Sequence, residues 1–354
     1  MIDPTVSAAG EPFVTMILPI RNEARYIARC LEAVLTQDYP RGRIEVLVVD
    51  GMSDDGTREI VQKTLERFNV STFQRCSVQV IDNPSRIVPT ALNRGVRQAR
   101  GEIIIRVDGH AVIAPDYVRL CVHDLANGDA DCVGGPIRTL GETWMARGIA
   151  IAQSSPFGVG NAAFRYAHRA QYVDTLAFGA YRREVFDRIG LFDEELARNQ
   201  DDEFNYRLTR SGGKIWLDPA IRSDYFSRAS LGALWKQYWE YGFWKVRVIQ
   251  KHGRPASWRH LVPAAFVLAV AASVILGMVG ESLMPVLAVA ASYAAASLAA
   301  SLALAFRKGW RYLPLLPLAF ATMHVAYGVG FLWGWVRFGF KHPVIVVPHQ
   351  KETV

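Results

Sequence analysis

The sequence predicts an α/β domain, with a mixed, mainly parallel sheet between helices, followed by a C-terminal transmembrane helical region. Short apolar runs alternate with helical periodicity over residues 14–107, and three long apolar segments follow residue 260. Carboxylates follow the same division, because Glu281 and Glu352 are the only acidic residues after Arg259. The chain of 354 residues therefore divides into a polar part and an apolar part.

The beginning of the chain follows a strand–helix rhythm. The expected strands are Val14–Pro19, Glu45–Asp50, Val78–Ile81 and Glu102–Val107. The expected helices between them are Glu23–Thr36, Asp55–Phe68 and Ser85–Arg100. Such a rhythm predicts parallel strands that helices cover on both faces, with ligands bound beyond the carboxyl ends of the strands.

The rhythm breaks after Asp108. The expected helices here are Pro115–Ala126, Glu142–Ala152, Arg182–Ile189 and Gln200–Ser211, and the expected strands are Asp131–Gly135 and Asp174–Tyr181. The glycine- and arginine-containing stretch Gly158–Arg169 predicts a loop. Residues 231–249 combine several aromatic side chains with Lys236, Lys245 and Arg247, which is typical of an amphipathic helix at a membrane interface.

The apolar part predicts a multi-pass membrane protein. Leu261–Gly280, Pro285–Phe306 and Leu313–Val336 each approach the roughly 20 apolar residues that cross a bilayer. Basic residues before the first segment and after the second indicate that residues 1–260 are cytoplasmic and that the protein lies in the inner (plasma) membrane. Proline and glycine interrupt the third segment and Arg337 and Lys341 follow it, so we favour three crossings only narrowly over a re-entrant or surface-lying third segment.

We therefore expect four regions along the chain. They are a cytosolic α/β domain (1–230), an amphipathic interfacial helix and linker (231–260), about three transmembrane helices (261–336) and a C-terminal tail (337–354). Residues 1–10 do not resemble a signal peptide. The cysteines show no paired spacing and are expected to be reduced thiols in the core: Cys30, Cys76, Cys121 and Cys132.

The formal net charge of +7 does not indicate nucleic-acid binding. The cations gather beside the apolar segments, and no nucleic-acid-binding motif accompanies them. This distribution predicts anionic membrane lipids as partners.

Three acidic motifs carry the candidate chemistry: Val49–Thr57, Arg106–His110 and Gln200–Phe204. Asp50 follows an apolar strand, and a carboxylate there can accept hydrogen bonds from a nucleobase or a ribose. Helix capping is the alternative role for Ser53 or Asp54, although it does not account for Asp50.

The second and third motifs predict a metal site and a general base. Asp108 and His110 offer a carboxylate and an imidazole, which suit Mn²⁺ or Mg²⁺ bridging two phosphates. The alternative interpretation of these residues is a glycine turn with a histidine that has no function there. Asp201 and Asp202 begin a helix, where carboxylates also act as ordinary dipole partners. We assign Asp201 as the general base and keep Asp202 as its main rival.

These motifs stand in a recurring order. The pattern comprises Pro19-x-x-Asn22-Glu23, Val49-Asp50-Gly51-x-Ser53-x-Asp55-Gly56-Thr57, Asn93-x-Gly95, Ala99-x-Gly101-Glu102, Asp108-x-His110, Gly190-x-Phe192-Asp193-Glu194 and Gln200-Asp201 with Arg207. In this respect residues 13–250 resemble the family 2 glycosyltransferases of GT-A fold. The resemblance implies inverting, metal-dependent sugar transfer from a nucleotide donor such as a UDP-sugar.

The resemblance also implies residue roles. The residues it assigns to the nucleotide donor are Pro19, Asn22, Glu23, Asp50, Asp55, Asn93 and Asp108. Asp108 and His110 are assigned to the metal, and Asp201 to the base. The chain departs from the family pattern twice, because His110 replaces the usual second aspartate and Gln200 replaces the usual glutamate before the base.

The membrane segments are similar to those of succinoglycan-type glucosyltransferases of bacterial exopolysaccharide assembly. This similarity implies transfer of glucose or a related hexose to a polyprenyl-diphosphate-linked saccharide, with other glycan-assembly enzymes as partners. Arg165 or Arg169 would serve an anionic acceptor, although an exposed arginine is more often simply solvated.

Three alternatives remain open: a polyprenyl-phosphate monosaccharide synthase, a processive synthase and a degenerate membrane scaffold. The sequence after Gln237, Tyr238-Trp239-Glu240, lacks the Gln-x-x-Arg-Trp motif of processive synthases.

Overall fold

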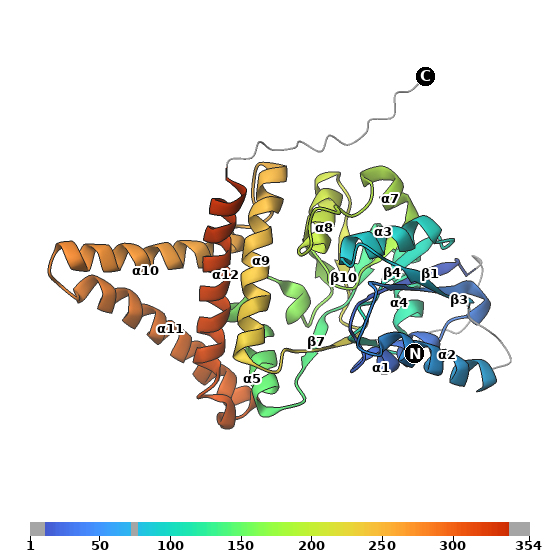
Figure 1. Ribbon diagram of the computed structural model, residues 1–354, viewed down its shortest axis with the longest axis horizontal. Helices are drawn as coiled ribbons and strands as arrows, with labels where there is room; N and C mark the ends of the chain where they lie inside the picture. Colours follow the sequence, from blue (N-terminus) through green and yellow to red (C-terminus); the bar gives the residue numbers. More distant parts are fainter. Residues whose placement is uncertain (1–10, 72–76, 340–354) are drawn as a thin grey trace, which may run out of the picture. The chain divides into compact units, whose positions relative to one another are not determined.

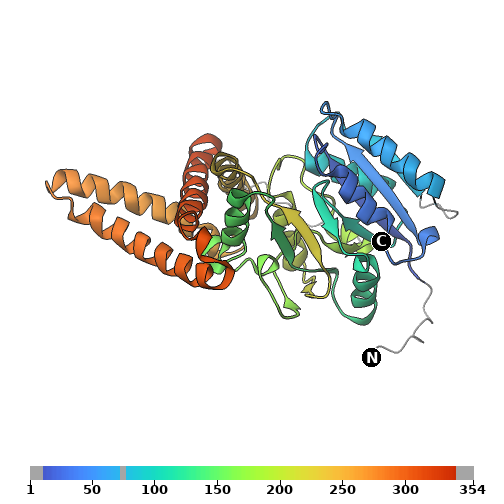
Figure 2. The same cartoon turned by 90° about the horizontal axis from the view of Figure 1, so that it is seen from below.

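The computed structural model describes residues 11–71 and 77–339 (Figures 1 and 2). The chain forms two compact units. The sheet unit comprises the chain up to Pro136 together with Arg169–Glu194 and Arg207–Ser223, and the helical unit comprises Ile137–His168, Glu195–Tyr206 and the chain from Asp224 onward. The two units are defined by contacts within the chain, whereas the four expected regions were defined by their position relative to a membrane. The expected boundaries at residues 230, 260 and 336 therefore stay predictions.

The sheet unit contains an eight-stranded sheet in the order β3-β2-β1-β4-β9-β6-β10-β8. The strands are β1 (Val14–Ile20), β2 (Ile44–Asp50), β3 (Ser77–Asp82), β4 (Ile103–Arg106), β6 (Cys132–Gly134), β8 (Gln171–Tyr172), β9 (Ala180–Arg182) and β10 (Ile215–Leu217). Strands β3, β2, β1 and β4 are parallel, and β10 is parallel to β6. Strand β9 is antiparallel to β4 and β6, and β8 is antiparallel to β10, so the predicted mixed, mainly parallel sheet is confirmed.

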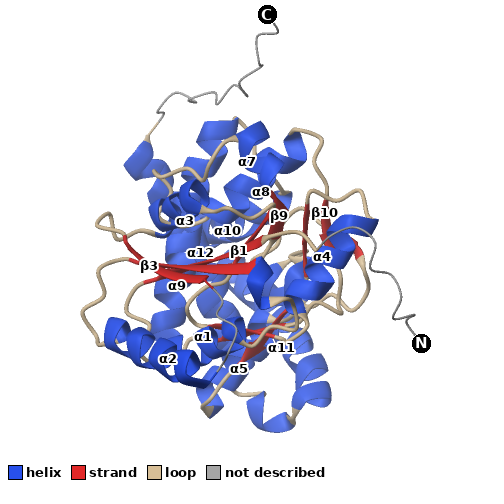
Figure 3. Cartoon of the chain, turned by 90° about the vertical axis from the view of Figure 1, so that its right-hand side faces the viewer, coloured by secondary structure: helices blue, strands red, loops and turns tan. Residues whose placement is uncertain are grey.

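Helices cover both faces of this sheet. The helices of the unit are α1 (Ile27–Leu35), α2 (Thr57–Ser71), α3 (Val88–Gln98), α4 (Tyr117–Asn127) and α7 (Arg183–Ile189). Helix α3 lies on one face, and α1 and α2 lie on the other (Figure 3). Every residue of β1 and β2 is buried, as expected of strands covered on both sides. Gly95 allows close packing, because a Cβ there would lie 2.5 Å from Ile17 Cγ2.

Several expected elements differ in extent. The helix expected from Glu23 begins at Ile27, because hydrogen bonds hold the preceding residues in a loop. The strand expected over Asp174–Tyr181 is reduced to β9. The expected loop Gly158–Arg169 contains the end of α6 (Pro156–Val159) and a 3₁₀ turn at Ala163–Arg165.

The sequence did not predict five strands of two to four residues: β5 (Ala111–Ile113), β7 (Ile137–Leu140), β8, β10 and β11 (Ser223–Phe226). They are too short to show a hydrophobic period. Three cysteines are free and buried, as predicted, namely Cys30, Cys121 and Cys132. Cys76 lies outside the described residues.

The helical unit is built around two long helices that lie side by side, α9 (Leu231–His252) and α12 (Leu316–Phe338) (Figure 1). Glycine allows them to approach closely, because a Cβ at Gly242 would lie 2.0 Å from the Tyr327 carbonyl oxygen, and one at Gly330 would lie 2.2 Å from the Trp239 carbonyl oxygen. Helix α5 (Trp144–Gln153) and α6 pack on α12, and the shared core includes Ile149, Leu234, Phe320 and Met323.

Helices α10 (Val262–Val279) and α11 (Met284–Lys308) form a hairpin that projects from the α9–α12 pair (Figures 1 and 2). Three helices in the described chain are long and apolar enough to cross a membrane: Trp258–Val279, Met284–Lys308 and Leu316–Phe338. The share of the apolar stretch that other parts of the protein bury is 17% in the first helix, 11% in the second and 44% in the third. The third helix therefore exposes far less apolar surface than the other two.

Candidate functional site

The loops that follow β1, β2 and β4 meet at one edge of the sheet. Ile20 pairs with Asp50 at the ends of β1 and β2, and Val107 follows β4 with its N–H bonded to the carbonyl of Ile17 in β1. Because parallel strands end at the same edge, Asp50 and Asp108 lie there together, as the sequence predicts.

Asp50 is fully buried and already holds its own loop in place. Its carboxylate accepts hydrogen bonds from Ser53 N at 3.1 Å and Ser53 Oγ at 2.5 Å, and it pairs with Arg58 Nε. Arg58 also reaches Asp82 at 2.5 Å. The geometry therefore shows Asp50 as the residue that orders the loop after β2.

A second set of bonds ties the loop after β1 to the loop after β2. Asn22 N donates to Ser53 Oγ at 2.9 Å, and Asn22 Nδ2 donates to Asp54 Oδ1 at 2.9 Å. Asp55 accepts from Ala24 N at 3.1 Å and from Thr57 Oγ1 at 2.5 Å. Burial acts to raise the pKa of Asp55, but these hydrogen bonds outweigh it and hold this pKa below its ordinary value.

Glu23 links these loops to the second acidic motif. Its Oε1 lies 2.8 Å from His110 Nδ1, and its N–H donates to Thr57 Oγ1 at 2.8 Å. A Cβ at Gly109 would lie 2.8 Å from Ile20 Cγ2 and 3.0 Å from Glu23 Cγ, so only glycine allows this approach. Residues predicted from separate motifs therefore converge at this edge.

Asp108 and His110 supply a carboxylate and an imidazole, which are ligand types for a divalent cation that also binds a diphosphate. Arg106 binds both carboxylate oxygens of Asp108, at 2.8 Å and 3.0 Å. The carboxylate of Glu23 orients the ring of His110, which is how metal-binding histidines are commonly fixed. Among the described residues no three His, Cys, Asp or Glu side chains form a metal-ligating group, so the cation would need phosphate and water oxygens as well.

Asn93 is hydrogen-bonded to the chain that follows α7. Its Nδ2 donates to Phe192 O and to Glu194 Oε1, each at 2.8 Å, and its Oδ1 accepts from Phe192 N at 2.9 Å. The side chain is 2% exposed. Asn93 thus braces α3 against residues 192–194, and its assignment to the nucleotide donor stays a prediction.

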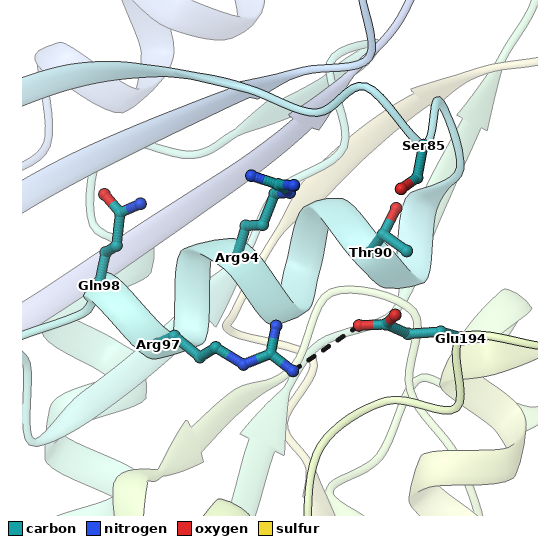
Figure 4. Close-up of a pocket in the computed structure, with 6 residues that line it drawn as sticks. All are labelled: Ser85, Thr90, Arg94, Arg97, Gln98 and Glu194. Carbon is teal, nitrogen blue, oxygen red and sulfur yellow. Dashed lines mark ion pairs between the residues drawn. The ribbon is translucent and has the colours of Figure 1, made fainter.

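A surface pocket of about 350 Å³ lies along α3 (Figure 4). Its lining residues are Ser85, Thr90, Arg94, Arg97, Gln98 and Glu194. Arg97 Nη2 lies 3.8 Å from Glu194 Oε1 across it. None of the residues predicted to bind donor or metal lines this pocket.

The third acidic motif begins α8 (Gln200–Arg210). Arg198 Nε binds Glu240 at 2.8 Å, and Asn199 Nδ2 donates to the carbonyl of Tyr241 at 2.9 Å, so α9 supports the start of α8. Asp201 Oδ1 accepts a hydrogen bond from Asp202 N at 2.9 Å.

The two aspartates differ in electrostatic environment. Asp202 forms an ion pair with Lys245, whose side chain is only 6% exposed. Burial acts to raise the pKa of Asp202, but Lys245, with His260 and Arg259, outweighs it and lowers this pKa to about 2. Such a carboxylate is a weak base at neutral pH, which favours Asp201 over Asp202 as the general base.

The sequence did not predict the role of the cations on α9. Lys245, Arg247 and Lys251 were expected at a membrane surface, yet all three are buried. Arg247 and Lys251 both bind Glu195, at 2.6 Å and 2.7 Å. Helical periodicity places these cations on α9 but does not reveal carboxylate partners that lie some forty to fifty residues earlier in the chain.

We expect Lys245→Met to destabilise the protein by about 3–5 kcal/mol, because it leaves Asp202 buried without its counterion. The melting temperature of the purified protein measures this loss. Lys236→Met on the exposed side of the same helix is the matched control and should change it little. The double variant Lys245→Met/Asp202→Asn should recover much of the loss, and its failure to do so would show that the ion pair is not the cause.

Comparison with known proteins adds independent findings. The family model described as glycosyl transferase family 2 matches residues 15–190. The succinoglycan biosynthesis protein ExoA of Rhizobium meliloti (strain 1021) is 31% identical over 319 residues, covering 89% of this chain and 93% of that protein.

Two further proteins are similar. The dolichyl N-acetyl-alpha-D-glucosaminyl phosphate 3-beta-D-2,3-diacetamido-2,3-dideoxy-beta-D-glucuronosyltransferase of Methanococcus voltae is 29% identical over 272 residues, covering 75% of this chain and 82% of that protein. The solved structure of mannosyltransferase PcManGT from Pyrobaculum calidifontis, in complex with GDP-Man and Mn²⁺, matches with a TM-score of 0.58 at 23% identity. That match covers 94% of this chain and 89% of the other, and it shows a shared GT-A fold.

Proposed function

The chain belongs to glycosyl transferase family 2, and on that premise we propose that it moves a hexose, such as glucose, from a UDP-sugar to a lipid-linked saccharide. The observation that carries this proposal is the convergence of Asp50, Glu23, Asp108 and His110 at one edge of the parallel sheet. This edge is where such sheets bind nucleotides.

We assign donor binding to the sheet unit. Asp50 and the loops that Asn22 and Asp55 hold together would accept the nucleoside, and Pro19 lies near the end of β1, just before the first of these loops. Asp108 and His110 would hold Mn²⁺ or Mg²⁺, which when bound neutralises charge on the diphosphate leaving group. A Mn²⁺ ion in the similar mannosyltransferase structure supports this choice of cofactor.

We assign acceptor activation to Asp201 in the helical unit. Its carboxylate would take the proton of the acceptor hydroxyl as that oxygen attacks the anomeric carbon. The new bond forms between that oxygen and the anomeric carbon, and the bond from this carbon to the diphosphate oxygen breaks with inversion. The low pKa of Asp202 supports Asp201 in this role.

A lipid-linked acceptor accords with the membrane helices of the helical unit. The name of the Methanococcus voltae relative states that it acts on a dolichyl phosphate-linked sugar. The three candidate membrane helices support association with a membrane. We assign this to the inner membrane, with the catalytic residues in the cytoplasm, because nucleotide sugars are found there.

The packing of α12 favours two crossings over the three that the sequence narrowly favoured. Helix α12 lies against α9, which carries charged residues from Lys236 to Lys251, and against α5 and α6. A full crossing by α12 would draw these polar elements into the bilayer, which is costly. We propose that α10 and α11 cross as a hairpin and that α12 lies on the cytoplasmic side.

Single-cysteine labelling in intact cells tests this topology. In a variant without the four native cysteines, a cysteine at Gly280 should react with an impermeant reagent, whereas one at Gly309 or Thr353 should react only after lysis. External labelling at Thr353 would restore the third crossing, and external labelling at Gly309 would overturn the hairpin.

Binding of a panel of UDP-, GDP- and dTDP-sugars to the purified protein in Mn²⁺ tests the donor assignment. We expect UDP-sugars to bind most tightly. Equal or tighter binding of GDP- or dTDP-sugars would overturn the choice of UDP.

A further inference from the structure

An arginine without a polar partner lies inside the helical unit. Arg165 is half-buried, its Nη1 is buried without a hydrogen-bond partner, and no described residue forms an ion pair with it. Its guanidinium instead lies over two aromatic rings, 5.3 Å from the centroid of Phe164 and 5.6 Å from that of Tyr225. A buried guanidinium nitrogen without a hydrogen-bond partner is costly, so its presence requires an explanation.

The phenol and amide groups near Arg165 form hydrogen bonds with one another, and Arg228 is a second cation that acts on Tyr225. Arg165 interacts electrostatically with the buried phenols of Tyr225 and Tyr238. Gln237 donates to Tyr241 Oη at 2.9 Å and to Tyr225 Oη at 3.5 Å. The amide oxygen of Gln153, which contacts Gln237 through its Nε2, is a second buried polar atom without a partner.

This cluster is adjacent to the base that we assign. The backbone carbonyl of Tyr241 accepts a hydrogen bond from Asn199 Nδ2, two residues before Asp201. Tyr238 belongs to the apolar core that α9 shares with α12. Helix α9, which carries Gln237 and Tyr238, therefore contacts both the start of α8 and the apolar core of the same unit.

We propose that Arg165, with Gln237 and the surrounding tyrosines, binds the phosphate of the lipid-linked acceptor. Arginine forms charge-assisted, often bidentate hydrogen bonds with phosphate, and the phenol and amide groups add neutral donors. The neighbouring apolar helices suit the attached lipid. This inference rests on the proposed function, because it names the acceptor's binding group.

Arg169 lacks these features although it lies in the same segment. It is exposed to solvent, whereas Arg165 has a buried nitrogen and two aromatic neighbours. Arg169 therefore provides a matched control for loss of one positive charge from this part of the chain.

The test uses the full-length protein in phosphatidylcholine nanodiscs and four probes, with empty nanodiscs as the blank. Farnesyl diphosphate carries both phosphate and lipid, inorganic pyrophosphate carries phosphate alone, farnesol carries lipid alone, and UDP with Mn²⁺ reports on the donor site. Calorimetric titration measures binding of each. We expect the wild type to bind farnesyl diphosphate more tightly than pyrophosphate and to show no binding of farnesol beyond its partition into empty nanodiscs.

Arg165→Met should weaken binding of farnesyl diphosphate by about tenfold or more, as expected for loss of charge-assisted hydrogen bonds. Arg169→Met should bind it as the wild type does, and UDP binding should be the same in both variants. The melting temperature of Arg165→Met should equal or exceed that of the wild type, because the substitution removes a buried cation without a partner. A merely structural arginine would instead lower it.

Three results would overturn the inference. In the first, Arg165→Met binds farnesyl diphosphate as tightly as the wild type does. In the second, the wild type does not bind farnesyl diphosphate. In the third, Arg165→Met loses UDP binding, which would assign the guanidinium to the donor. Failure of the wild type to bind UDP would contradict the proposed function instead, so the two failures are distinguishable.

Discussion

Asp201→Asn should lower sugar transfer by about 10²–10⁴-fold while leaving UDP-sugar binding nearly intact. The amide has nearly the shape of the carboxylate but cannot take the proton of the acceptor hydroxyl. Donor binding should persist because Asp50, Asp108 and His110 belong to the sheet unit. Single-turnover transfer and equilibrium binding of the same UDP-sugar measure the two quantities separately.

Asp202→Asn is the matched control, because it neutralises the neighbouring carboxylate on the same helix. We expect it to lower the melting temperature by leaving Lys245 without its counterion, and to lower transfer much less than Asp201→Asn does. Loss of turnover in Asp202→Asn alone would reverse the assignment. Full transfer in both variants would favour a phosphate acceptor, which requires less help from a base.

Removal of divalent cations should abolish transfer, because Asp108 and His110 would otherwise hold a cation against the diphosphate. We expect at least a hundredfold loss, about the scale of losing one electrostatic stabiliser of the leaving group. Added Mn²⁺ or Mg²⁺ should restore the rate. Full transfer in excess chelator would contradict the metal site.

His110→Ala should weaken cation-dependent binding of the UDP-sugar, and Glu23→Gln should weaken it less, because the carboxylate of Glu23 acts on the cation through the imidazole. His123→Ala is the control, since the His123 side chain is 65% exposed. Titration of the donor with and without Mn²⁺ measures each effect. Wild-type binding by His110→Ala would exclude the imidazole as a ligand.

Much of the sheet unit was predictable because its signals are local. Apolar runs such as Ile44–Asp50 have the composition of buried parallel strands, and the amphipathic stretches between them predict covering helices. Asp50 and Asp108 could be placed at one edge because both follow such strands. Short strands such as β8 and β11 were missed because two to four residues cannot show a period.

The unpredicted features depend on partners distant in the sequence. Asn93 and Lys245 contact Phe192 and Asp202, partners that no local pattern identifies. The apolar composition of α12 predicts a membrane span equally well whether lipid or α9 covers it. Arg165 likewise differs from Arg169 only through its aromatic neighbours and its buried nitrogen.

The most direct test of the proposed function is release of UDP by the purified full-length protein in Mn²⁺, with extracted polyprenyl-diphosphate-linked saccharides as acceptors. We expect UDP release from at least one UDP-hexose, dependent on the lipid-linked acceptor, together with a product that is one sugar longer. Absence of both UDP release and product with every UDP-hexose, under conditions in which the protein remains folded, would contradict the proposed function.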